Sequence, residues 1–155
     1  MAGSGSPEFG IDGSGLRVAI VAAQWHEAFM TGLIEGAQLA LTEARVAESV
    51  LVQVPGSFEV PLVVATLAPT YDAVVALGVI IKGGTPHFQF VADTVSHQLA
   101  RIAVDSGTPV GFGILTCDNE AQARDRSGLS GARESKGYEA AMSAVTTAVT
   151  VRGLR

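Results

Sequence analysis

The chain of 155 residues is long enough to bury the core of one domain, and nothing in it indicates a second. Its net charge of −5 argues against a nucleic-acid partner, and its hydrophobic content of 48% excludes a disordered chain. No apolar run reaches the length of a membrane span, and no signal-peptide pattern opens the chain. The single cysteine, Cys117, excludes an internal disulfide and fits a reducing compartment, so we expect a cytoplasmic protein.

Residues 1–15 read MAGSGSPEFGIDGSG and show no hydrophobic periodicity. Glycine and serine dominate them, and the run GSPEF is typical of a cloning-site scar. We interpret this segment as a vector-derived, disordered leader, which leaves residues 16–155 as the folded domain.

From residue 16 onward, strand-like and helix-like patterns alternate. Apolar runs predict strands at 16–22, 49–54, 73–81 and 110–116. Apolar residues three or four apart predict helices at 27–45, between Ser57 and Pro69, at 88–105, from 118 or 119 to 126, and at 136–152. In the second helix we expect the buried side to consist of Val60, Leu62, Val63, Val64 and Leu67.

This alternation predicts an α/β fold, a three-layer α/β/α sandwich with a four-stranded parallel sheet of flavodoxin-like architecture. In open parallel sheets, ligands bind beyond the carboxyl ends of the strands. That rule selects the segments 23–26, 55–59, 82–87 and 117–119.

Residues 78–93, GVIIKGGTPHFQFVAD, contain the end of a buried strand, a glycine-rich turn and the start of a helix. Glycines let backbone approach an anion, and the free N–H groups of a helix start point at it. Thr85 adds a hydroxyl and Lys82 a charge, while His87 is the side chain whose unperturbed pKa suits proton transfer near neutrality. The alternative is an ordinary turn followed by a structural histidine.

Residues at the other strand ends also carry two interpretations. Trp25 either stacks on a flat heterocycle or is a partly buried packing residue, and we interpret His26 as a helix-start residue. Glu59 favours a helix start whatever else it does. In the region around 121–128, chemistry alone does not choose between Arg124 and Arg126 as an anion ligand.

Three further residues have a plain structural interpretation. Phe112 lies inside a predicted strand and is read as a core residue by composition, and Lys136 as a solvated lysine at a helix start. Cys117 has no histidine partner nearby in sequence, so we interpret it as an inert buried thiol. No H-x-x-H or C-x-x-C pattern predicts a metal site.

Six separated segments resemble one known family. In chain order they are AQWH, VPGSFEVP, ALGVIIKGGTPHF, GILT, DRSG and ESKG, and they span essentially all of residues 16–154. By these motifs the chain is identified as a member of the lumazine synthase family, and it resembles the pentameric mycobacterial and actinobacterial members. Departures from the commonest family pattern are Lys82, where arginine is frequent, and Gly84, where a larger residue often stands.

The resemblance implies a transferase of riboflavin biosynthesis that condenses 5-amino-6-(D-ribitylamino)uracil with 3,4-dihydroxy-2-butanone 4-phosphate. The products would be 6,7-dimethyl-8-ribityllumazine, phosphate and water, with no cofactor and no metal. The turn at 128–136 is longer than in members that form icosahedral shells, which favours a homopentamer.

The resemblance also implies a role for each matching residue, with His87 as the catalytic proton shuttle. Residues that match pyrimidine- or ribityl-binding positions are Trp25, Ser57, Phe58, Glu59, Val79, Ile80, Ile81, Phe112 and Lys136. Residues that match phosphate-binding positions are Gly83, Gly84, Thr85 and Arg126. Phe112, Arg126 and Lys136 match positions that a neighbouring subunit contributes, so active sites between subunits are implied.

Other classes of protein fit parts of the pattern. A non-catalytic flavin- or lumazine-binding protein would use the same stacking residue and phosphate cradle. A receiver-type signalling domain would need an acidic cluster after the first strand, and AIVAAQWH has none. A flavodoxin-like electron carrier usually presents a serine- and threonine-rich loop there, which this chain lacks.

Overall fold

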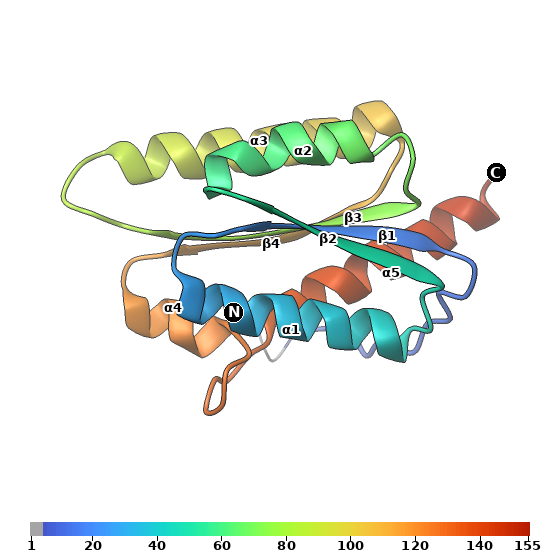
Figure 1. Ribbon diagram of the computed structural model, residues 1–155, viewed down its shortest axis with the longest axis horizontal. Coiled ribbons are helices and arrows are strands. Elements are labelled where there is room, and N and C mark those ends of the chain that lie inside the picture. The colour runs from blue at the N-terminus through green and yellow to red at the C-terminus, as the bar shows by residue number, and fades with distance from the viewer. Residues whose placement is uncertain (1–4) are drawn as a thin grey trace.

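The computed structural model describes residues 5–155, in which one parallel sheet of four strands lies between two layers of helices (Figure 1). In chain order the elements are β1 (Arg17–Ala23), α1 (Glu27–Glu43), β2 (Glu48–Val54), the 3₁₀ turn η1 (Ser57–Glu59), α2 (Val60–Leu67), β3 (Ala73–Ile81), α3 (His87–Ser106), β4 (Val110–Cys117), α4 (Glu120–Arg126) and α5 (Lys136–Gly153). The predicted three-layer fold is confirmed.

The strand order in the sheet is β2-β1-β3-β4, with every neighbouring pair parallel. The chain moves to one side of β1 with β2 and to the other side with β3. A crevice therefore forms at the carboxyl ends of β1 and β3, where the direction of winding reverses, and such a crevice is where open α/β sheets bind ligands.

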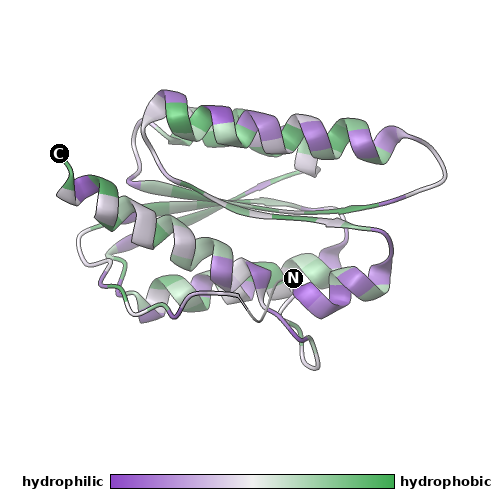
Figure 2. Ribbon diagram, turned by 180° about the vertical axis from the view of Figure 1, so that it is seen from behind, coloured by the Kyte–Doolittle hydropathy of each residue, from purple (hydrophilic) through white to green (hydrophobic). Residues whose placement is uncertain are grey.

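Strand β3 is the centre of the core, because residues 73–80 are all buried. Helices α1 and α5 cover one face of the sheet with residues such as Leu33 and Val145, while α2 and α3 cover the other with Val64 and Leu99. Figure 2 shows the hydrophobic strands lying between helices on which hydrophobic and hydrophilic residues alternate. Burial on both faces explains the continuous β-branched run of the β3 sequence.

Two expectations about burial are wrong. Leu62 is 74% exposed, because it lies two residues, or about 200° around the helix, from Val60, which is fully buried against the sheet. Phe112 is 51% exposed, and it lies in β4, an edge strand that pairs with β3 alone. Hydrophobicity alone therefore did not identify the buried positions.

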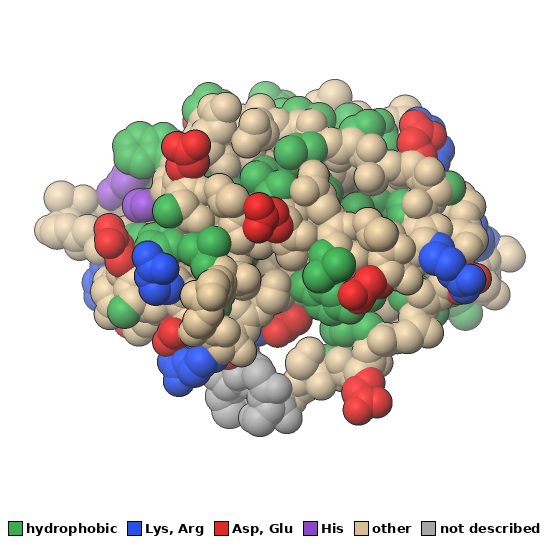
Figure 3. Space-filling model, turned by 60° about the horizontal axis from the view of Figure 1, so that its bottom comes forward, with side chains coloured by type: hydrophobic (Ala, Val, Ile, Leu, Met, Phe, Trp, Pro, Cys, Tyr) green, Lys and Arg blue, Asp and Glu red, His purple; other side chains and the backbone are tan. Residues whose placement is uncertain are grey.

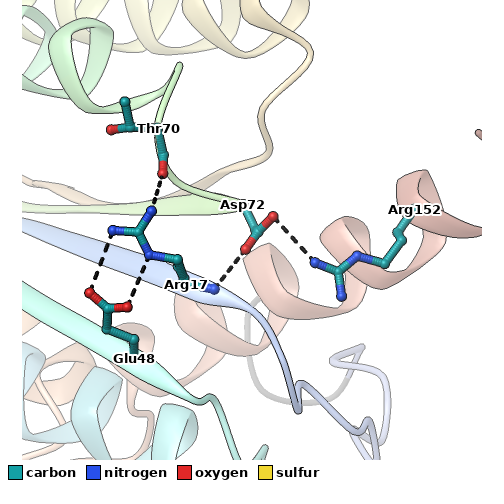
Figure 4. A network of polar contacts seen from close by, with 5 residues as sticks. All are labelled: Arg17, Glu48, Thr70, Asp72 and Arg152. Carbon is teal, nitrogen blue, oxygen red and sulfur yellow. Dashed lines mark hydrogen bonds and ion pairs between the residues drawn. The ribbon is translucent and has the colours of Figure 1, made fainter.

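The amino ends of the strands are closed by a network of charged groups (Figure 4). The Arg17 guanidinium donates to Glu48 at 3.0 Å and to the Thr70 carbonyl at 2.9 Å. The Asp72 carboxylate accepts the Arg17 backbone N–H at 2.7 Å and pairs with Arg152 at 3.3 Å. This network joins β1, β2, the segment before β3 and α5 at the end of the sheet opposite the crevice.

The predicted leader lies partly outside the described residues, which begin at residue 5. Within it, Phe9 and Ile11 pack against the core cluster that includes residues of α1 and α5, and the Gly13 N–H donates to the Ala44 carbonyl at 2.6 Å. The later part of the segment thus contacts the domain, while its vector origin and the domain boundary stay predictions.

Candidate active site

The carboxyl ends of β1, β2 and β3 open into a cavity of about 630 Å³. Predicted site residues that line this cavity are Trp25, Ser57, Phe58, Glu59, Val79, Ile80, Ile81, Gly83, Thr85 and His87. They come from three separate segments of the chain, at residue 25, at 57–59 and at 79–87, which the strand order brings together. This end of the molecule is on the left in Figure 1, and on the left in Figure 3 histidine side chains lie beside hydrophobic ones.

The first wall of the cavity is the turn after β1. The backbone N–H of Gln24 donates to the Val54 carbonyl at 2.9 Å, and that of Trp25 donates to the Pro55 carbonyl at 3.3 Å. This fixes the backbone while the indole of Trp25 stays 69% exposed at the cavity. In this chain, the indole is available for stacking on a flat ligand.

The second wall is η1, which continues directly into α2. One carboxylate oxygen of Glu59 accepts the Gly56 N–H at 2.9 Å, so Glu59 has the structural role at a helix start that its position predicts. Ser57 is buried, whereas Phe58 is 59% exposed. The wall therefore presents an aromatic ring, a carboxylate and a hydroxyl to the cavity.

The third wall is the glycine-rich turn between β3 and α3. The Lys82 N–H donates to the Cys117 carbonyl at 2.8 Å, which ties the start of the turn to β4. Neither Gly83 nor Gly84 has a positive φ, and a Cβ on either would meet no atom within 4 Å. Neither the backbone conformation nor packing within the chain therefore requires glycine at these positions. The space beside the backbone is open, so a ligand can approach it.

His87 is the first residue of α3, and its exposed side chain lines the same cavity as Thr85. The cavity also contains Phe90, Val91 and Thr94, which our sequence analysis did not select. These residues follow His87 at intervals of three, four and seven, so they share its face of the helix. Helical spacing counted from His87 would have identified them.

The structure distinguishes the two arginines of α4. The Arg124 guanidinium lies 5.8 Å from the ring centroid of Phe29, in a cation–π contact. Arg126 is partly buried and donates from Nη1 to the Gln122 carbonyl at 3.0 Å. Arg124 is therefore engaged with an aromatic ring of α1, while the remaining guanidinium donors of Arg126 can serve another group.

Lys136 is not the solvated lysine that its position alone indicates. Its side chain is 20% exposed, and its Nζ lies 2.6 Å from Glu139 and 3.1 Å from Glu134. Burial lowers the pKa of Lys136, but hydrogen bonds to Glu139 and Glu134 outweigh it, so the pKa lies above its ordinary value. The ammonium is thus held in place by two carboxylates.

Four predicted site residues, Gly84, Phe112, Arg126 and Lys136, do not line the cavity. Gly84 lies in the turn between two lining residues, Gly83 and Thr85. The other three belong to β4, α4 and α5, and they are the residues that the resemblance assigns to a neighbouring subunit. The cavity of one chain therefore contains one part of the predicted site.

Cys117 is 1% exposed at the end of β4. Burial raises the pKa of its thiol, the charge of Asp118 adds to this, and Arg126 partly opposes it. A buried thiol with a raised pKa is a poor nucleophile, which agrees with its interpretation as inert. Within residues 5–155, no three His, Cys, Asp or Glu side chains gather in a way that could hold a metal ion.

The arrangement is suited to holding a flat polar heterocycle and moving protons on it. Trp25 offers an aromatic face for stacking, and His87 offers an imidazole that can transfer protons. The last residues of β3, which line the cavity, offer backbone N–H and carbonyl groups for hydrogen bonds. None of the helices in residues 5–155 has both the length and the apolar character that crossing a membrane requires.

Comparison with known proteins gives a consistent result. A family model described as 6,7-dimethyl-8-ribityllumazine synthase matches residues 15–152. One relative with that name, from Kineococcus radiotolerans, is 56% identical over 99% of this chain and 96% of its own length. Another, from Streptomyces avermitilis, is 54% identical over 99% of this chain and 97% of its own length. A third, from Cutibacterium acnes, is 57% identical over 89% of this chain and 83% of its own.

Proposed function

The chain belongs to the 6,7-dimethyl-8-ribityllumazine synthase family, and from this premise we propose that it condenses 5-amino-6-(D-ribitylamino)uracil with 3,4-dihydroxy-2-butanone 4-phosphate. The reaction yields 6,7-dimethyl-8-ribityllumazine, phosphate and water. The observation that carries the proposal is that Trp25, which lies far from Thr85 and His87 in sequence, lines one cavity with both of them.

The pyrimidine substrate binds between the first and second walls of the cavity. The exposed indole of Trp25 stacks on its ring, and backbone groups of residues 79–81 pair with its polar edge. Ser57, Phe58 and Glu59 hold the ribityl chain. The wall formed by η1 supports this role, because it combines polar groups with an aromatic face.

The phosphate of the second substrate binds at the glycine-rich turn. Gly83, Gly84 and Thr85 offer backbone N–H groups and a hydroxyl just before α3, where the helix dipole favours an anion. Arg126 completes this site with paired hydrogen bonds, for which a guanidinium is suited. The open space beside both glycines supports the close approach of a phosphate.

The chemistry requires proton transfers and no electron transfer. The amine of the pyrimidine attacks the ketone, and water leaves to form an imine. Phosphate is then eliminated. The second amine attacks the remaining carbonyl carbon, and a second water leaves as the ring closes. His87 moves the protons, and much of the rate comes from holding the two reactants together. The reaction therefore needs neither a redox cofactor nor a covalent nucleophile.

We further propose that the protein is a homopentamer in the cytoplasm, with each active site between two subunits. Phe112, Arg126 and Lys136 lie outside the cavity of their own chain and would complete the cavity of the next. Phe58 and Phe90, which are exposed and line the same cavity, support an interface there, since exposed apolar side chains that gather at one place mark contact surfaces. Light scattering should give a pentameric mass, and a megadalton particle would contradict this.

The alternative is a non-catalytic protein that binds flavin or lumazine in the same cavity. The imidazole of His87 at the cavity and the available donors of Arg126 favour an enzyme. Binding of riboflavin without turnover would favour the alternative.

The experiment mixes purified protein with both substrates and follows lumazine absorbance above the uncatalysed background. We expect acceleration, and we expect Arg126→Ala to raise KM for the phosphate substrate by about tenfold to a hundredfold, because charged hydrogen bonds are lost. Arg133→Ala is the matched control, since Arg133 is exposed in the following loop and pairs with Asp125. No acceleration by the unmodified protein would refute the proposal.

A further inference from the structure

His26 has an unusual backbone conformation at the edge of the cavity. Its φ of 62° and ψ of 53° are left-handed, a conformation that only a few per cent of non-glycine residues adopt, with asparagine, aspartate and histidine the most frequent among them. It occupies the N-cap position of α1, where an extended conformation is the usual one. A strained residue beside a binding cavity calls for a functional explanation.

The strain is imposed from both sides. Toward α1, the carbonyl of His26 accepts the N–H groups of Phe29 and Met30, both at 3.0 Å. Toward β1, Trp25 is fixed by its N–H bond to the Pro55 carbonyl at 3.3 Å. Since both flanks are held, the dihedral angles of His26 set the direction in which Trp25 leaves the sheet.

The imidazole of His26 contacts two aromatic side chains, the buried ring of Phe29 and the exposed indole of Trp25. Its centroid lies 6.4 Å from that of Phe29 with the planes inclined by 28°, and Phe29 is 7% exposed. Its centroid lies 6.4 Å from that of Trp25 in an edge-to-face arrangement, with an interplanar angle of 60°. Both distances and both orientations lie in the range of favourable aromatic pairs.

The other side of the indole is limited by Gly56. A Cβ at position 56 would lie 3.5 Å from Cδ1 of Trp25 and 3.9 Å from Nε1, so the indole edge runs directly beside this backbone. The indole is thus flanked by His26 and by Gly56. An exposed side chain held on two sides is pre-organised for stacking.

We propose that His26 is a positioning residue, whose left-handed turn and ring, packed on Phe29, hold the Trp25 indole in the orientation that stacks on the pyrimidine. This inference rests on the proposed function of the cavity. It also explains why a histidine occupies the turn, because glycine or asparagine would adopt the backbone with less strain but has no ring to contact Phe29 and Trp25.

The chain offers a direct probe, because Trp25 is its only tryptophan. His26→Asn keeps a residue that tolerates the left-handed backbone and removes the ring. We expect acrylamide to quench Trp25 fluorescence more efficiently in this variant. We also expect the Kd for 6,7-dimethyl-8-ribityllumazine and the KM for the pyrimidine substrate to rise about three- to tenfold, with kcat changed less than about twofold.

Two further variants test the backbone strain in the absence of the ring and provide a control. His26→Gly relieves the strain and also lacks the ring, so it should behave like His26→Asn. Arg45→Asn is the matched control, because Arg45 has a left-handed φ of 58° just beyond the other end of α1 and does not line the cavity. Its quenching and its KM should equal those of the unmodified protein.

The outcomes for the two proposals differ. Quenching and KM unchanged in both His26 variants, with far-UV circular dichroism of a folded protein, would overturn the role of His26. Absence of lumazine formation by the unmodified protein would instead overturn the proposed function. The quenching experiment needs no substrate, so it decides about His26 in either case.

Discussion

The sharpest prediction concerns Gly78, which lies in β3 directly under η1. A Cβ at this position would lie 2.4 Å from Oγ of Ser57 and 3.2 Å from its Cβ, and 3.1 Å from Cδ1 of Ile114. These distances are shorter than van der Waals contacts allow. Gly78→Ala must therefore displace the Ser57 hydroxyl by about 1 Å, either by rotating the side chain or by moving η1 away from the sheet.

The size of the effect follows from that displacement. Overpacking a buried position costs about 1–3 kcal/mol of folding free energy. A misplacement of about 1 Å in a group that holds substrate lowers the rate by up to about a hundredfold. We therefore expect kcat/KM for the pyrimidine substrate to fall about ten- to a hundredfold, measured by lumazine absorbance on protein whose unfolding is followed in urea.

Gly113→Ala is the matched control on the paired strand β4. Its Cβ would lie 2.5 Å from Cδ2 of Leu77, 3.0 Å from the Ala76 carbonyl oxygen and 3.2 Å from the Cβ of Ala140, which belongs to α5. We expect Gly113→Ala to lower the free energy of unfolding by a similar amount and to leave kcat/KM within about threefold, since none of the residues that its Cβ would contact lines the cavity. Equal kinetic losses in both variants would refute the reasoning, because the loss would then follow stability and not the position of Ser57.

Two further predictions concern titrating groups. His87→Ala should lower kcat by up to about a hundredfold and flatten the pH–rate profile, since the residue that moves protons is lost; a profile unchanged in shape would exclude this role. For Lys136, hydrogen bonds to Glu139 and Glu134 raise the pKa above its ordinary value of 10.5, so its stabilisation is complete below that pH and is lost as the pH rises through the folded-state pKa. Lys136→Met should therefore be less stable than the unmodified protein in urea at about pH 8, with a smaller difference at about pH 11; a difference independent of pH would contradict the pairing.

Local physical chemistry was enough to predict the elements. The apolar β-branched run at 73–81 has the composition of a strand buried on both faces, and its observed limits are Ala73–Ile81. Helix α3 begins at His87, one residue before the predicted start, because the preceding glycines and Pro86 end the strand and leave a free helix start. Motifs spread over the whole domain identified the family, and most residues that they select line one cavity.

The tertiary structure decided what depends on contacts between distant segments. Strand order is one such property: β1 lies between β2 and β3, so Trp25, Ser57 and Thr85 meet. Residues 117–119 lie at the end of β4, which is separated from β1 by β3, and they do not line the cavity. The tertiary structure also decided three properties of single side chains. These are the contact between Arg124 and Phe29, the pairing of Lys136 with two carboxylates, and the exposure of Phe112. Local periodicity reports which face of an element is apolar, but the packing partner of that face is selected by the fold as a whole.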